Sequence, residues 1–123
     1  MDMPVPMTAA ADWEAAYVES FRRPVLIFKH STECPISGGA RDELSNWLED
    51  AASLSLSPVM VLVPENRGVA MAIAEQLNLK HESPQLILVD GGKVSWHASH
   101  WQITYSALDE HLGTHCEKQH FVV

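Results

Sequence analysis

Apolar residues recur along the chain in two patterns, short continuous runs and stripes at helical spacing. The runs at 25–28 and 59–63 are too short for helices and are bounded by polar residues or proline, which is typical of strands covered on both faces. Stripes at helical spacing precede, separate and follow these runs, at 8–21, 35–51 and 66–78. This alternation predicts a parallel βαβ unit preceded by an extra N-terminal helix.

The second part of the chain has a different pattern. Leu86 to Val89 is a short apolar run, Gly91-Gly92 suits a tight turn with positive φ, and residues 93–97 alternate between apolar and polar side chains. These features predict a β-hairpin. Thr104 is then a candidate cap for a helix that ends at Gly113.

The order of these elements predicts one α/β domain over residues 1–123 with a thioredoxin-like fold. We expect a central mixed four-stranded sheet flanked by helices, with irregular tails at 1–7 and 114–123. The composition agrees with one domain, because 123 residues of which 46% are hydrophobic can bury a single core.

Charge and cysteine content narrow the possible functions. Sixteen acidic residues against eight basic ones give a formal charge of −8, and the basic residues are scattered, so we expect no nucleic-acid partner. No segment approaches the roughly 20 apolar residues of a membrane span, and the N-terminus lacks the pattern of a signal peptide. We therefore expect a cytoplasmic protein without a membrane partner, in which Cys34 and Cys116 are separate thiols.

The candidate catalytic group is the thiol of Cys34. Pro35 suits the first turn of a helix, so Cys34 is expected at the N-cap, where free backbone N–H groups and the helix macrodipole favour the thiolate. Thr32 and Ser37 are candidate hydroxyl donors to the sulfur. His30 is a candidate source of positive charge beside it.

The spacing Cys-x-x-Ser defines the kind of thiol chemistry. A dithiol oxidoreductase uses a second cysteine three positions after the first, and here that position is Ser37, whose hydroxyl cannot form a disulfide. The chemistry must therefore be monothiol, with a mixed disulfide on Cys34 that an external thiol removes.

A second feature is Ser83-Pro84, directly before a predicted strand. In thioredoxin-like proteins a cis-proline at this place faces the reactive cysteine, and the backbone of the preceding residue pairs with an extended substrate. This position favours the cis form over an ordinary trans proline that opens a strand.

Three stretches, at 28–37, 80–85 and 96–104, together resemble the monothiol bacilliredoxin family. The resemblance implies a thioredoxin-like oxidoreductase that removes bacillithiol from S-bacillithiolated proteins, with Cys34 as the nucleophile and Pro84 beside it. It also implies no bound cofactor, bacillithiol as thiol co-substrate, and S-bacillithiolated proteins as partners.

Two other functions fit the same residues. One is a non-catalytic thioredoxin-like module that binds an extended peptide beside Pro84. The other is a glutaredoxin-like monothiol protein that uses glutathione or holds an iron–sulfur cluster, although few basic residues are available to bind glutathione carboxylates.

The remaining candidates are interpreted as structural. Four potential metal ligands occur near the C-terminus: His111, His115, Cys116 and His120. We expect no metal site, because they span a helix end and an irregular tail. Trp13, Trp47 and Trp101 are expected in the core rather than on a binding surface.

Overall fold

The two continuous apolar runs form neighbouring parallel strands at the centre of the fold. In the computed structural model, which describes residues 4–118, β2 (Val25–Ser31) pairs in parallel with β4 (Ser57–Val63) and antiparallel with β5 (Gln85–Asp90). β6 (Lys93–Ser99) and the short β1 (Val5–Pro6) complete a mixed five-stranded sheet in the order β1-β4-β2-β5-β6. The strand that leads to the candidate cysteine, β2, is therefore the central strand.

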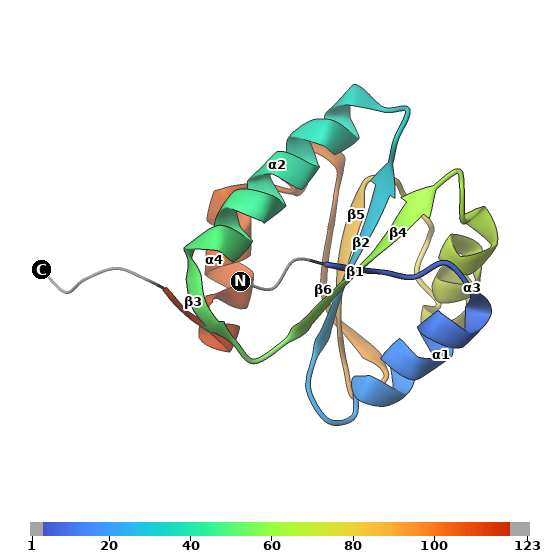
Figure 1. The fold of residues 1–123 in the computed structure, drawn as a ribbon, viewed down its shortest axis with the longest axis horizontal. Coiled ribbons are helices and arrows are strands. Elements are labelled where there is room, and N and C mark those ends of the chain that lie inside the picture. The colour runs from blue at the N-terminus through green and yellow to red at the C-terminus, as the bar shows by residue number, and fades with distance from the viewer. Residues whose placement is uncertain (1–3, 119–123) are drawn as a thin grey trace, which may run out of the picture.

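The α-helices of the described chain are α1 (Ala10–Glu19), α2 (Pro35–Asp50), α3 (Arg67–Leu77) and α4 (Tyr105–Leu112). Figure 1 shows α2 and α4 on one face of the sheet and α1 and α3 on the other. Each pair of helices buries an apolar cluster against its face, with Trp47 in the first and Trp13 in the second. No helix of residues 4–118 combines the length and the apolar character that crossing a membrane requires.

The thioredoxin-like architecture is confirmed, but the expected four-stranded sheet and irregular tails are wrong in part. Val5–Pro6 adds a fifth strand, parallel to β4. At the other end, β7 (Cys116–Lys118) pairs antiparallel with β3 (Ala51–Leu54), which follows α2 directly. Strands of two to four residues are too short to show a period in the sequence. Two short 3₁₀ helices precede and follow α4, η1 (His100–Gln102) and η2 (Gly113–His115).

The start of α1 also differs from the prediction. The helix begins at Ala10, and the Asp12 carboxylate accepts the backbone N–H groups of Thr8 and Ala9 at 2.9 and 3.0 Å. These two backbone bonds hold the pKa of Asp12 below its ordinary value. Asp12 thus closes the first turn of the helix, whose N-cap is Ala9. The predicted cap of α4 is confirmed, since its N-cap hydroxyl accepts the N–H of Ala107 at 3.1 Å.

The β5–β6 hairpin turns on two glycines with positive φ, as predicted. Gly91 has φ 61° and Gly92 has φ 78°. A Cβ atom at Gly92 would lie 2.7 Å from the ring of Phe21 and 2.9 Å from the hydroxyl of Tyr17. Gly92 is therefore required both for its backbone conformation and for the close approach of the two rings.

Gly92→Ala should destabilise the fold by about 1–3 kcal/mol, because alanine at this φ is strained and its methyl group collides with Phe21. Chemical denaturation measures the effect. The matched control is Gly68→Ala in α3, where the added methyl meets nothing within 4 Å and should raise stability by up to about 1 kcal/mol. Equal effects of the two substitutions would contradict this account.

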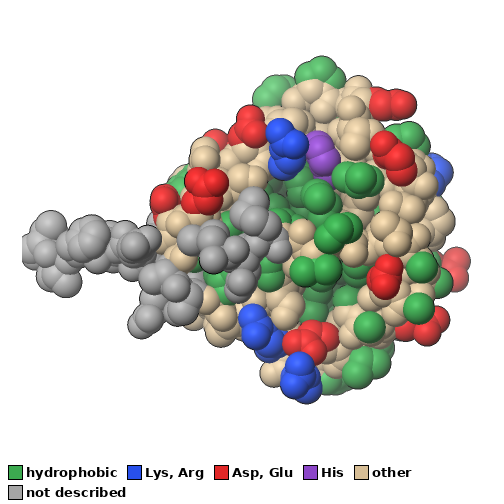
Figure 2. Space-filling view, in the orientation of Figure 1, with side chains coloured by type: hydrophobic (Ala, Val, Ile, Leu, Met, Phe, Trp, Pro, Cys, Tyr) green, Lys and Arg blue, Asp and Glu red, His purple; other side chains and the backbone are tan. Residues whose placement is uncertain are grey.

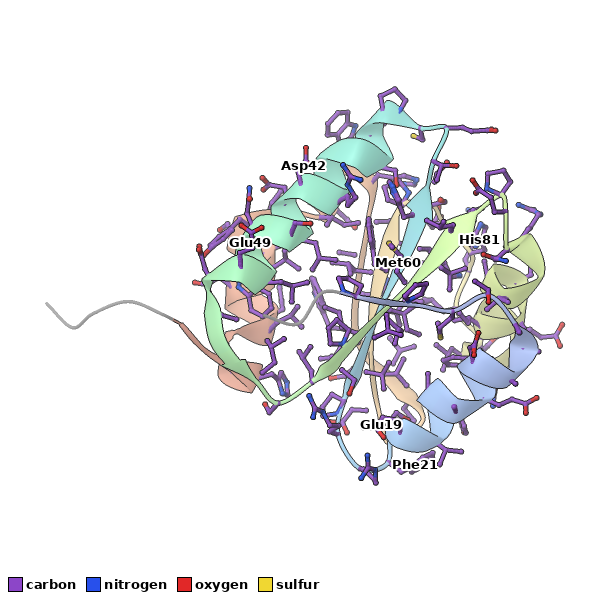
Figure 3. All side chains as sticks on the ribbon, in the orientation of Figure 1. Glu19, Phe21, Asp42, Glu49, Met60 and His81 are labelled. Carbon is purple, nitrogen blue, oxygen red and sulfur yellow. The ribbon has the colours of Figure 1, made fainter. Side chains whose placement is uncertain are left out.

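A lysine is buried in the sheet. The side chain of Lys29, on β2, is fully buried, and its ammonium group lies 3.2 Å from Nδ1 of His81. Burial lowers the pKa of Lys29 to about 8, against the smaller opposing effect of Glu82. Burial also lowers the pKa of His81, so its neutral ring can accept a hydrogen bond from the ammonium group of Lys29. In Figure 3, His81 lies on the α3 side of the sheet, away from Asp42 and Glu49 on α2.

This burial predicts a pH dependence of stability. The unfolded chain keeps the Lys29 proton up to pH 10.5, whereas the folded protein releases it near pH 8, so the unfolded state binds more protons in between. The free energy of unfolding should therefore rise between pH 8 and 10.5. Lys29→Met should remove this rise, and the exposed Lys93→Met should keep it. A rise that persists in Lys29→Met would contradict the assignment.

Candidate active site at the entrance of α2

Cys34 occupies the N-cap of α2, as the sequence predicts. Its φ of −116° and ψ of 121° are extended, and Pro35 is the first helical residue. The turn before it is fixed to the end of β4, because the N–H of Thr32 donates to the carbonyl of Val63 at 3.1 Å. Cys34 is partly exposed and is a free thiol. The central strand thus delivers the cysteine to the surface at its carboxyl end.

The backbone of the first helical turn surrounds the cysteine. The Cys34 carbonyl accepts the N–H groups of Ser37 and Gly38 at 3.0 and 3.3 Å. Pro35 has no N–H, and an N-cap side chain ordinarily accepts from the second or third helical residue. The amide of Ile36 is therefore the donor available to a thiolate at Cys34, although the thiol makes no cap hydrogen bond in this structure.

The Ser37 hydroxyl, a predicted donor to the sulfur, forms hydrogen bonds with β2. Ser37 is fully buried, and its oxygen accepts the N–H of Ser31 at 2.8 Å and lies 2.7 Å from Nδ1 of His30. Burial lowers the pKa of His30, with a further contribution from Arg41, so the ring is neutral near pH 7 and its Nδ1 can accept. In the tautomer that leaves Nδ1 of His30 without a proton, the single hydroxyl proton of Ser37 goes to His30.

Two other predicted supports of the thiolate are corrected in the same way. The Thr32 hydroxyl donates to the carboxylate of Glu65 at 2.9 Å, so its proton is also committed elsewhere. His30 is buried, stacks on Phe28 with ring centroids 5.4 Å apart, and is neutral, so it supplies no positive charge near pH 7. Sequence reasoning could name these side chains but not their partners.

The Ser83-Pro84 motif lies at the same end of the sheet as Cys34. The Ser83–Pro84 peptide bond is cis, as predicted. Lys29 of β2 is paired with Gln85 of β5 in antiparallel register. Pro84, which precedes Gln85, therefore lies toward the end of β2 where the turn to the cysteine begins. The strand register therefore brings the predicted motif to the entrance of α2.

Ser83 carries a free hydrogen-bond donor. Its hydroxyl oxygen is buried and has no hydrogen-bond partner within the described part of the chain. A buried hydroxyl without a hydrogen-bond partner destabilises the folded state. This makes the Ser83 hydroxyl a candidate donor to a bound substrate or to the thiolate. The carbonyl of Pro84 is occupied, because it accepts the N–H of His100 at 3.1 Å.

The hydrogen bond from His100 to Pro84 fixes η1 beside the Ser83-Pro84 motif. η1 contains Trp101, whose location was predicted wrongly from the sequence. Trp101 was expected in the core, but 77% of its surface is exposed. It lines a hollow of about 380 Å³ that begins at Pro35 and Ile36. The only sequence signal was its place in one of the three stretches that resemble a known family.

The surroundings are acidic rather than basic. Glu33 directly precedes the cysteine and is exposed, and Glu65 holds Thr32. Figure 2 shows acidic side chains spread over one face of the molecule, with Lys and Arg at few places. The N-terminus of α2 supplies positive potential at Cys34 in these surroundings.

Among residues 4–118 no group of three or more His, Cys, Asp and Glu side chains lies close enough to hold a metal ion. Of the potential ligands near the C-terminus, His111 instead stacks on Trp96 with ring centroids 4.8 Å apart. His120 lies outside the described residues.

Comparison with solved structures supports the fold. The chain is similar to a protein with a thioredoxin fold at 28% identity, with a TM-score of 0.74 over 87% of this chain and 91% of that one. It is also similar to Fasciola hepatica thioredoxin (16% identity, TM-score 0.69, 90% and 98% covered) and to Trxlp from Edwardsiella tarda EIB202 (21%, 0.66, 88% and 97%).

Comparison with protein families is more specific. Residues 5–108 match the family described as monothiol bacilliredoxin BrxC. The match spans most of the chain and contains Cys34, Ser37 and the Ser83-Pro84 motif, so it confirms the resemblance found in the sequence. The chain belongs to the monothiol bacilliredoxin family, and with it to the thiol redox proteins of the thioredoxin fold.

Proposed function

We propose that the protein removes bacillithiol from S-bacillithiolated proteins through Cys34. The observation that carries this proposal is a partly exposed thiol at the N-cap of α2, at the same end of the sheet as cis-Pro84, in a chain of the monothiol bacilliredoxin family. The Cys34 thiolate attacks the bacillithiol sulfur of the mixed disulfide. One S–S bond breaks and one forms, so the target leaves as a reduced thiolate and Cys34 carries the bacillithiol.

The free Cys34 thiol must be regenerated by a group outside the Cys-x-x-Ser motif. Ser37 has no sulfur, and its buried hydroxyl forms hydrogen bonds with His30 and Ser31. A second bacillithiol therefore attacks the adduct and leaves as bacillithiol disulfide, which restores the Cys34 thiolate and balances the two electrons. The reaction needs no bound cofactor.

Two donors support the thiolate in this proposal. The N–H of Ile36 is the helix amide left for an N-cap acceptor, and the unpaired Ser83 hydroxyl is the side-chain donor. Hydrogen bonds to a charged group contribute about 1.5–3 kcal/mol each, which is more than the helix dipole alone supplies at an exposed site. The backbone of Ser83 would pair with the extended segment of the target on either side of its modified cysteine.

Cys34→Ala tests the nucleophile. Mass spectrometry of the wild type after incubation with bacillithiol disulfide should show one bacillithiol adduct, and Cys34→Ala should show none. Cys116→Ala is the matched control and should keep the adduct, because the proposal gives that sulfur no role. A wild type that remains unmodified would overturn the proposal and favour a peptide-binding module without turnover.

Ser83→Ala tests the free hydroxyl. Loss of a hydrogen bond worth about 1.5 kcal/mol should move the appearance of the thiolate ultraviolet absorbance upward by about one pH unit. The exposed Ser95→Ala should leave the titration unchanged. If the two variants titrate alike, the Ser83 hydroxyl does not contact the sulfur.

A further inference from the structure

The hollow beside Cys34 is not used by the reaction described above. It lies between the first turns of α2 and η1, has a volume of about 380 Å³, and is lined by Pro35, Ile36, Gly39, Ala40, Glu43, His100, Trp101, Ile103 and Thr104. Most of these side chains are apolar, and the exposed indole of Trp101 supplies the largest aromatic surface. A mostly apolar cavity with a few polar groups is typical of a small-molecule site.

The polar side chains that line the hollow favour a ligand that donates hydrogen bonds over an anionic ligand. Glu43 lines it, and no Lys or Arg is among the described residues that do so. One carboxylate oxygen of Glu43 accepts the N–H of Tyr105 at 2.7 Å, which fixes this side chain in the lining of the hollow. An anionic occupant would be repelled by this carboxylate, whereas an uncharged polyol would donate to it.

We infer that this hollow binds the sugar ring of the thiol substrate, an inference that rests on the proposed function. Bacillithiol is a glucosamine acylated on nitrogen by cysteine and joined at its anomeric oxygen to malate. Its pyranose ring has apolar C–H faces that can stack on Trp101 and hydroxyl groups that can donate to Glu43. The malate carboxylates would then point out of the hollow to solvent.

The dimensions agree with this placement. Five bonds separate the cysteine sulfur of bacillithiol from its sugar ring, a reach of about 6 Å. Pro35 and Glu43 are eight residues apart on α2, which corresponds to about 12 Å along the helix axis. A ring attached to the Cys34 sulfur therefore falls between the entrance of the helix and Glu43, where the hollow lies.

The connection to the catalytic groups is also direct. Trp101 follows His100, whose N–H donates to the carbonyl of Pro84 and whose φ of 53° is unusual for a residue other than glycine. η1 is therefore held against the cis-proline, and Trp101 lines the same hollow as Pro35 at the entrance of α2. The hydrogen bond fixes Trp101 relative to the position of the disulfide.

The test compares two substrates that differ only in the sugar. One model peptide is capped on its cysteine with bacillithiol and the same peptide is capped with cysteine. Trp101→Ala should lower kcat/KM for the bacillithiol cap about tenfold, as expected for loss of an aromatic stack, and leave the cysteine cap unchanged. Glu43→Gln, which keeps an acceptor for Tyr105, should show the same selectivity with a smaller loss.

Trp96→Phe is the control, since Trp96 stacks on His111 outside the hollow, and it should not discriminate between the caps. Equal losses on both caps in Trp101→Ala would overturn the inference and indicate that the hollow holds a side chain of the target protein. A wild type that fails on the bacillithiol cap but reduces a glutathione cap would instead overturn the proposed function.

Discussion

The position of Cys34 depends on the buried hydrogen bonds of the Ser37 hydroxyl. This group accepts the N–H of Ser31 at the end of β2 and contacts Nδ1 of His30 on the same strand. It thereby joins the first turn of α2 to the central strand of the sheet. Because the hydroxyl and the imidazole are both buried, breaking either bond would leave an unsatisfied polar group, and the geometry of the turn is correspondingly well determined.

This use of Ser37 explains why the site has no internal resolving group. In a dithiol protein the same position would present a sulfur to the mixed disulfide. Here the position is occupied by a buried hydroxyl that bonds to Ser31 and His30 of the central strand and so stabilises the fold. In the proposed function, the helix backbone and the unpaired hydroxyl of Ser83 would support the thiolate, in surroundings that include Glu33 and Glu65.

Much of this arrangement could be predicted from the sequence, because long apolar patterns and special residues determine it. The central strands, the N-cap position of Cys34 and the glycines of the hairpin all follow from local chemistry. The partners of Thr32 and Ser37 could not be predicted, since each hydroxyl had more than one possible acceptor and only the tertiary structure selects among them. Strands β1 and β7 were missed because two or three residues carry no period.

The exposure of Trp101 could not be predicted from the sequence either. An aromatic residue in an apolar context is usually buried, yet η1 is fixed by its bond to Pro84 in a conformation that leaves the indole at the surface. A monothiol cycle needs two successive thiol–disulfide exchanges at one sulfur, so the groove must admit a second small thiol while the first is still attached. The hollow, which begins at the helix entrance and is lined mostly by apolar side chains, would hold the sugar of the attached thiol, so the second thiol must reach the sulfur from outside the hollow.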